Sequence, residues 1–131
     1  MATIRKEITV NATVGQVWDA IRDLGALHTR LVPGFVVDTR LELGARVVTF
    51  ANGRVAREVI VTIDEDARRL VWSAAGERLA HHNASAQALE NADGTTRIVW
   101  VADLLPDSMA DTIAQMMDQG IAAMKAALDR A

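Results

Sequence analysis

VAREVIVTI at residues 55–63 and LVWSAA at residues 70–75 form the stretch of sequence that decides the fold. Both segments are rich in β-branched or alternating residues, which favour extended strands. Asp64-Glu65-Asp66 follows the first segment and is typical of a solvated hairpin turn. The two segments therefore predict antiparallel strands joined by a short turn.

Further strands are predicted on both sides of this hairpin. They occupy Phe35–Leu41, Ala45–Ala51, Ala80–Leu89 and Thr96–Leu104. Asn52-Gly53 and Asp93-Gly94 separate alternating runs, and such dipeptides are the strongest short-range signal for a hairpin. Thr3–Val10 alternates apolar and polar residues and predicts one more strand. We therefore expect a curved antiparallel sheet of seven strands, with the last six forming a meander.

Helical periodicity flanks the meander at both ends. After the first strand, apolar residues recur at helical spacing, and Asn11 or Thr13 caps a helix that Gly25 ends. Ala26–Leu31 predicts a second short helix. Pro106 opens a helix of more than twenty residues, long enough to lie across the sheet. The expected architecture is an α+β fold with its helices on one face of the sheet.

The composition excludes several classes of protein. The chain has 131 residues, 14 Lys and Arg, 17 Asp and Glu, a formal charge of −3 and no cysteine. We expect a single domain over residues 1–131. Without cysteine there is no disulfide, thiolate metal site or cysteine nucleophile. Positive and negative residues are mixed, so the sequence shows no basic patch of the kind that binds nucleic acid, and we expect no nucleic-acid partner. We also expect no metal and no cofactor.

Motif searches exclude further activities. Neither a glycine-rich phosphate loop, nor Gly-x-Ser-x-Gly, nor His-Glu-x-x-His occurs, which argues against kinases, common hydrolases and zinc enzymes. No run approaches the ~18–20 apolar residues of a membrane span. The N-terminus is charged where a signal peptide would be apolar. We therefore expect a cytoplasmic protein without integral membrane association.

Several stretches carry a resemblance to a known superfamily. They are TVGQVWDAI at residues 13–21, REVIVTID at 57–64 with RLVWS at 69–73, and TTRIVW at 95–100. Together with the element order, they resemble the SRPBCC superfamily of START-like domains, birch-pollen allergens, abscisic-acid receptors and bacterial polyketide cyclase/dehydratase-like proteins. The resemblance covers essentially the whole chain and implies the helix-grip fold. It also implies a cavity between the sheet and the long C-terminal helix, which holds lipids, hormones or aromatic polyketides in the family.

The residues themselves also favour an open cavity. Small residues are expected at the inner face: Ala84, Ala86, Ala88, Ala102 and Gly120. Methionines, which adapt to irregular guests, stand opposite at Met109, Met116, Met117 and Met124. The alternative is that larger residues close the space and form a solid core.

The scarce aromatic residues are expected to line this cavity. The expected ligand-binding residues are Trp72, Trp100, Phe35, Phe50, His28, Met116, Met117, Gly120 and Met124. Trp100 shares the more apolar face of its strand, and Trp72 matches an inward aromatic residue of the family. His28 lies near the expected mouth, in a loop that commonly gates the pocket in the family. Trp18 lies on the apolar stripe of the first helix and is expected to pack there.

Glu58 is the sharpest candidate for chemistry, although its direction stays open. Val59 on one face of its strand is as apolar as Ile60 on the other, so alternation does not choose between them. In the hormone-receptor branch of the superfamily, the matching glutamate faces the pocket. The alternative is a solvent-facing Glu58 paired with Arg46 or Arg57. An inward carboxylate would be prepared by desolvation to act as a general base.

His82 is the second candidate. The resemblance directs His82 inward with Ala84 and Ala86, and directs His81 outward. Neighbours on a strand point to opposite faces, so the two histidines do not readily share a metal ion. His82 is either a hydrogen-bonded core or rim histidine, or a ligand contact and proton shuttle. Arg46, Arg78 and Asp103 are expected to be surface charges.

Three functions compete at this point. The first is binding or transport of a small hydrophobic lipid, aromatic or polyketide-like ligand in the cavity. The second is a cofactor-independent cyclase, dehydratase or isomerase that uses Glu58 or His82 for proton transfer. The third is a protein-interaction module with a filled cavity. The oligomeric state stays open between a monomer and a weak homodimer.

Overall fold

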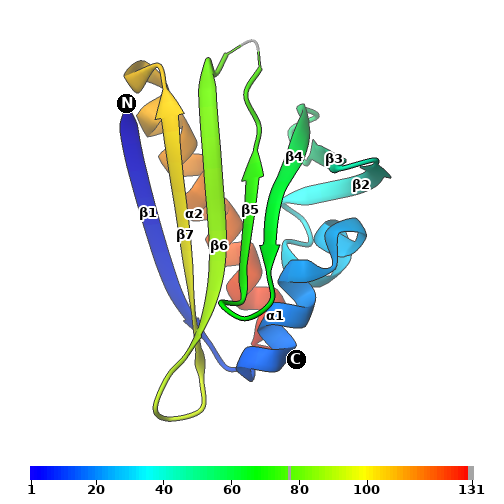
Figure 1. Cartoon of the computed structure of the whole chain (residues 1–131), viewed down its shortest axis with the longest axis vertical. Helices are drawn as coiled ribbons and strands as arrows, with labels where there is room; N and C mark the ends of the chain where they lie inside the picture. The colour runs from blue at the N-terminus through cyan, green and yellow to red at the C-terminus, as the bar shows by residue number, and fades with distance from the viewer. Residues whose placement is uncertain (77, 130–131) are drawn as a thin grey trace.

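The computed structural model describes residues 1–76 and 78–129 of the chain (Figure 1). In chain order the elements are β1 (Ala2–Val10), α1 (Val14–Arg22), the 3-10 turn η1 (Leu24–Ala26), the π-turn η2 (Leu27–Leu31), β2 (Val36–Glu42), β3 (Ala45–Phe50), β4 (Val55–Asp64), β5 (Arg69–Ser73), β6 (His81–Glu90), β7 (Thr96–Leu105), the 3-10 turn η3 (Asp107–Met109) and α2 (Ala110–Leu128). This order confirms the predicted α+β class and the helix-grip arrangement.

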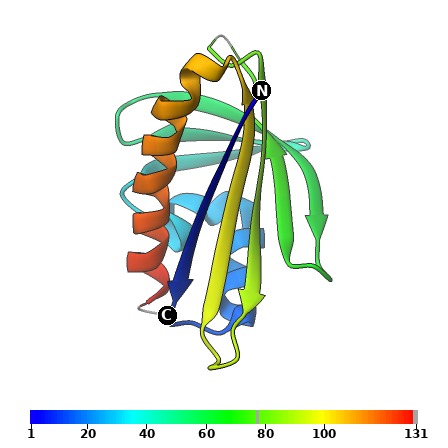
Figure 2. The same cartoon turned by 90° about the vertical axis from the view of Figure 1, so that its left-hand side faces the viewer.

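The strands form one antiparallel sheet in the order β1-β7-β6-β5-β4-β3-β2. Each strand from β2 to β7 therefore lies beside its neighbour in sequence, as the hairpin signals predict, and β1 pairs with β7. Figure 2 shows α2 running lengthwise along one side of the sheet, while β2 and β3 cross near its upper end. The sheet thus curls around the helix.

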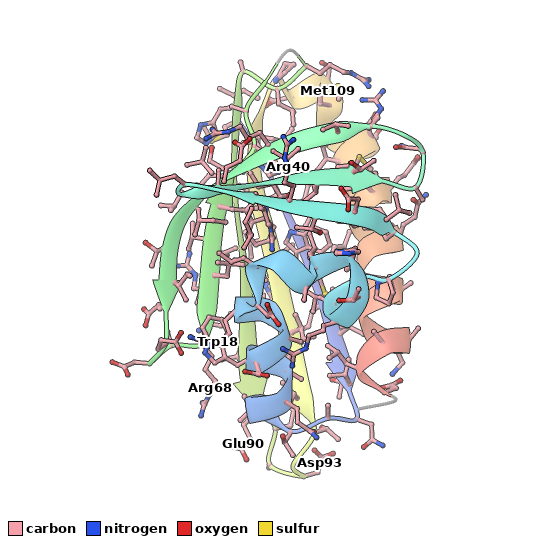
Figure 3. The ribbon with its side chains drawn as sticks, turned by 90° about the vertical axis from the view of Figure 1, so that its right-hand side faces the viewer. Trp18, Arg40, Arg68, Glu90, Asp93 and Met109 are labelled. Atoms are coloured by element: carbon pink, nitrogen blue, oxygen red, sulfur yellow. The ribbon has the colours of Figure 1, made fainter. Side chains whose placement is uncertain are left out.

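The first helix is fixed by a local cap and a distant anchor. Thr13 is the N-cap, since its side chain accepts from the backbone N–H of Gln16 and the Gln16 side chain accepts from the Thr13 N–H. At the other end, Glu65 in the β4–β5 turn accepts from Trp18 Nε1 at 3.0 Å and from Arg22 Nε at 2.8 Å. Figure 3 shows Trp18 on α1 beside this turn. The acidic turn is therefore a docking point for α1 as well as a solvated loop.

The short helical elements differ from the sequence-based prediction in detail. The first helix ends at Arg22 rather than Gly25. The predicted short helix over residues 26–31 is present as the π-helix Leu27–Leu31, and the 3-10 turn Leu24–Ala26 precedes it. Without a side-chain cap on either turn, the segment follows the packing of its buried residues Leu27 and Leu31 rather than an intrinsic helical preference.

Small residues on the inner face bring α2 close to the sheet. Ala84, Ala86, Ala88 and Ala102 are each at most 2 % exposed. At Gly120 a Cβ would lie 2.7 Å from Cζ3 of Trp100, so only glycine fits this crossing of helix and sheet without a shift. Among the described residues, no helix is long and apolar enough to cross a membrane.

Candidate ligand-binding cavity

A cavity of about 200 Å³ lies between the inner face of the sheet, η2 and α2. Its closed end is formed by buried apolar residues from α1, η2, β5 and α2: Ile21, Leu27, Leu31, Leu70 and Met124. Its mouth is formed by exposed and half-buried residues from the β3–β4 turn, the β5–β6 loop and the start of α2: Arg54, Val55, Arg78, Leu79, Met109, Thr112 and Ile113. Figure 3 labels Met109, which lies where α2 begins.

The space exists because a small residue stands between two large ones. In the strand register Leu70 lies opposite Ala86, and Ala86 lies opposite Trp100. All three line the cavity. An alanine at the centre of this row leaves room that a larger side chain would fill.

Three polar residues line the cavity in a single row across the inner face. Arg46 on β3 lies opposite Glu58 on β4. Further along the row, the Ala74 N–H donates to the His82 carbonyl at 3.3 Å, which places Ala74 beside His82. Because Val59 pairs with Ser73, the same register places Ala74 between Glu58 and His82. The small side chain of Ala74 therefore leaves the carboxylate and the imidazole open to the same space.

Arg46 and Glu58 form a buried ion pair in the cavity wall. Arg46 Nε donates to Glu58 Oε1 at 2.8 Å, and the two side chains are 3 % and 11 % exposed. The Arg46 guanidinium carbon also lies 5.9 Å from the centre of the Trp72 ring, within the range of a cation–π contact. Arg46 Nη1 has no hydrogen-bond partner in the part of the chain that the structure describes. The ion pair compensates both charges, and the Arg46 Nη1 group remains available to donate a hydrogen bond to a ligand.

His82 is buried in the cavity wall. It is 9 % exposed, and its Nδ1 atom has no hydrogen-bond partner among the described residues. Burial lowers the pKa of the His82 imidazole, the charge of Glu58 opposes this shift, and His81 adds to it. A neutral imidazole has one nitrogen that accepts a proton, so His82 and Glu58 both offer basic atoms to the cavity.

Aromatic pairs surround this polar row. The Trp72 and Trp100 rings are tilted at 47° with centres 6.3 Å apart, and Phe35 and Phe50 meet edge to face at 5.3 Å. All four residues line the cavity, together with Met116, Met117 and Met124 from α2. These seven side chains stand where the sequence analysis places them, and their contact with a ligand stays a prediction.

Two of the expected ligand contacts lie outside the cavity lining. His28 shares a hydrogen bond of 3.0 Å between its Nδ1 and Thr39 Oγ1, which ties η2 to β2. Gly120 packs directly against Trp100 and Phe35, so it supports two lining residues rather than lining the cavity itself.

Arg46 and Arg78 were expected to be surface charges, and the structure corrects this for Arg46. Arg46 is 2 % exposed and forms part of the cavity wall. The signal lay in its strand, because Arg46 alternates with Val48 and Phe50, and Phe50 was already expected to face the cavity. Arg78 is exposed but lines the mouth, as does Arg54. No sequence pattern distinguishes these two loop arginines from other solvated ones.

Other charged residues hold the scaffold. Asp103 accepts a hydrogen bond from Thr3 Oγ1 at 2.6 Å between β7 and β1.

Within residues 1–76 and 78–129, no three His, Cys, Asp or Glu side chains are grouped so as to hold a metal ion.

Comparison with protein families identifies the fold family. The family model described as polyketide cyclase/dehydrase and lipid transport matches residues 1–129. The chain belongs to this family. The match confirms the resemblance to polyketide cyclase/dehydratase-like proteins that the sequence analysis stated. No curated protein gives a significant match.

Several solved structures have the same fold as this chain, although their sequence identity to it is low. An uncharacterised protein from Bacillus thuringiensis is 16 % identical with a TM-score of 0.85, over 97 % of this chain and 98 % of that one. The di-domain aromatase/cyclase BexL of the BE-7585A biosynthetic pathway is 16 % identical with a TM-score of 0.83, over 98 % of this chain and 47 % of that one. Norcoclaurine synthase from Thalictrum flavum is 17 % identical with a TM-score of 0.73, over 98 % and 84 %. At such identities the likeness is one of fold.

Proposed function

We propose that this protein binds a small, largely apolar molecule in the cavity between its sheet and α2. The observation that carries the proposal is the cavity itself, about 200 Å³ in volume and lined mainly by aromatic, aliphatic and methionine side chains. Concave apolar sites with a few polar groups are the usual form of a small-molecule site. An apolar cavity of 150 Å³ is sufficient for benzene, so a compound of one or two rings suits this volume.

The family supports the same proposal. Its description joins polyketide cyclases and dehydrases with lipid transport, and both activities need a molecule enclosed in the fold. The polar row of Arg46, Glu58 and His82 would orient the guest, while the apolar closed end would supply most of the binding free energy.

The methionines provide a direct test with a built-in control. Four of the five methionines line the cavity, whereas Met1 is 64 % exposed and lies outside it. In a sample labelled with 13C at the methionine methyl groups, naphthalene should shift the NMR signals of Met117 and Met124 through its ring current. The Met1 signal should stay in place. Unchanged signals for all five methionines, with naphthalene near saturation, would contradict an accessible cavity and favour an interaction module.

A second function, proton-transfer catalysis, is favoured by one specific observation. Glu58 and His82 both line the cavity on either side of Ala74, and each offers a basic atom. General base catalysis needs such an atom within hydrogen-bond reach of an acidic C–H or O–H group. A bound ketone would lose an α-proton to Glu58 or His82 and form an enolate, with an Arg46 N–H available to the enolate oxygen.

Hydrogen–deuterium exchange tests this function without knowledge of the natural substrate. The two-ring ketone 2-tetralone in D2O exchanges its α-protons slowly by itself, and the wild-type protein should accelerate this exchange. Glu58→Gln or His82→Gln should reduce the acceleration. Glu42→Gln, which changes a carboxylate outside the cavity, is the matched control. If the protein does not accelerate the exchange, the proposal of proton-transfer catalysis is contradicted and the proposal of ligand binding is unaffected.

A further inference from the structure

The wall of the cavity changes in polarity from its closed end to its mouth. The closed end is apolar and includes the buried residues Leu27 and Leu31. The row of Arg46, Glu58 and His82 crosses the wall, and Arg54 and Arg78 belong to the exposed mouth. A guest with one apolar and one polar end would bury its apolar end first, because water is lost most favourably from apolar surface.

The charges of the lining are unbalanced at the mouth. Among the residues that the structure describes, the lining contains the cations Arg46, Arg54 and Arg78 and a single anion, Glu58. The buried pair of Arg46 and Glu58 is compensated at 2.8 Å, which leaves the two mouth arginines in excess. The whole chain carries a formal charge of −3, so the positive lining runs against the overall charge. Charges of one sign around an opening with low-dielectric walls attract ligands of the opposite sign.

We propose that the ligand is an amphiphilic carboxylic acid with a body of one or two rings. Its apolar body lies at the closed end between Trp72 and the methionines of α2, and its carboxylate lies at the mouth beside Arg54 and Arg78. This inference deepens the proposed function and rests on it.

The buried row favours the same orientation. A carboxylate placed deep in the cavity would compete with Glu58 for Arg46, whose charge Glu58 already compensates at 2.8 Å, and would lie close to the Glu58 carboxylate. Like charges at short range in a desolvated site repel strongly. At the mouth the carboxylate meets guanidinium groups, whose planar donor pattern matches its two oxygens. The row then remains free to hydrogen-bond any hydroxyl or carbonyl group on the body.

A matched set of naphthalene derivatives tests the charge of the polar end. The probes are 2-naphthoic acid, the neutral 2-naphthalenemethanol and the cationic 2-naphthalenemethylamine, titrated against the whole chain by methionine-methyl NMR. Two exposed arginines should favour the acid over the alcohol by about threefold to tenfold. The amine should bind most weakly, and added salt should weaken the acid alone.

Substitution of the mouth arginines assigns the effect to the proposed place. Arg54→Gln with Arg78→Gln should reduce the affinity of the acid to that of the alcohol and leave the alcohol unchanged. Arg40→Gln with Arg57→Gln removes the same charge from exposed positions outside the lining and should keep the preference for the acid.

The outcomes separate this inference from the proposed function. An alcohol that binds as tightly as the acid, or a mouth variant that behaves like the control variant, would overturn the carboxylate assignment alone. Failure of all three probes to bind would overturn the cavity as a binding site as well.

Discussion

Two alanines on β6 provide the most direct test that the cavity is empty space. Ala86 and Ala88 are 1 % and 2 % exposed, and both face the inner side of the sheet. Ala86 lines the cavity, whereas Ala88 lies outside it and pairs with the fully buried Ile98. The same change, alanine to methionine, therefore enters open space at one position and packed core at the other.

The two substitutions should differ clearly in free energy of unfolding. In Ala86→Met the added atoms gain up to about 2 kcal/mol from burial, and fixing the side chain costs about 1.5–2 kcal/mol. The two contributions nearly cancel, so the stability should stay within about 1 kcal/mol of wild type. In Ala88→Met the added atoms must displace packed neighbours, which costs about 1–3 kcal/mol. Thermal unfolding should show Ala88→Met melting roughly 3–15 °C lower, at about 3–5 °C per kcal/mol for a chain of this length.

Ligand titration completes the comparison. Ala86→Met should block naphthalene, because the new side chain occupies its place, while Ala88→Met should still bind it whenever the variant is folded. An Ala86→Met variant that loses as much stability as Ala88→Met would refute the reasoning, because the space beside Ala86 would then be filled by protein.

Three further predictions concern single residues of the cavity wall. Arg46→Met leaves the buried Glu58 carboxylate without its partner and should lower the free energy of unfolding by about 3–5 kcal/mol in urea titrations; the double change of Arg46→Met with Glu58→Met should cost much less, and equal losses would argue against the pair. Because burial lowers the pKa of His82, the native state binds fewer protons than the unfolded chain once the pH falls below about 6.5, so stability should decrease from pH 7 toward pH 5. His82→Gln should flatten that part of the profile, and an unchanged profile would contradict the shift. Gly120→Ala places a Cβ 2.7 Å from the Trp100 ring, so it should shift tryptophan fluorescence and cost about 1–3 kcal/mol of packing, against a helix gain of about 1 kcal/mol; a raised melting temperature with unchanged fluorescence would speak against this contact.

The strands, and the order of β2 to β7 in the sheet, were predictable because the signals are local. Alternation over a few residues and glycine-containing turn dipeptides specify hairpins, and a meander of hairpins needs no further information about which strands pair. The long helix was equally predictable from its apolar spacing and from Pro106. The short helix over residues 26–31 was also predicted, but its π-helical geometry was not, since it has no side-chain cap and follows from packing.

The direction of Glu58 shows where local reasoning ends. Val59 and Val61 are exposed on the outer face of β4, while Glu58 is buried on the inner face with Arg46. A strand with apolar residues on both faces carries no alternation signal. The buried carboxylate is stable only because a cation from the adjacent strand reaches it, and that pairing depends on register.

The sequence by itself determined the α+β class, the seven strands, the long helix and the set of aromatic and methionine residues beside the cavity. The class, the strands and the helix follow from periodicity and turn chemistry, which act over a few residues, whereas the cavity and the inward Trp72 were implied by the family resemblance. Only the tertiary structure decided that Arg46 belongs to the wall, that Gly120 supports Trp100 and that Arg54 and Arg78 line the same cavity. Those relations join residues far apart in the chain, and they exist only once the sheet has curled around α2.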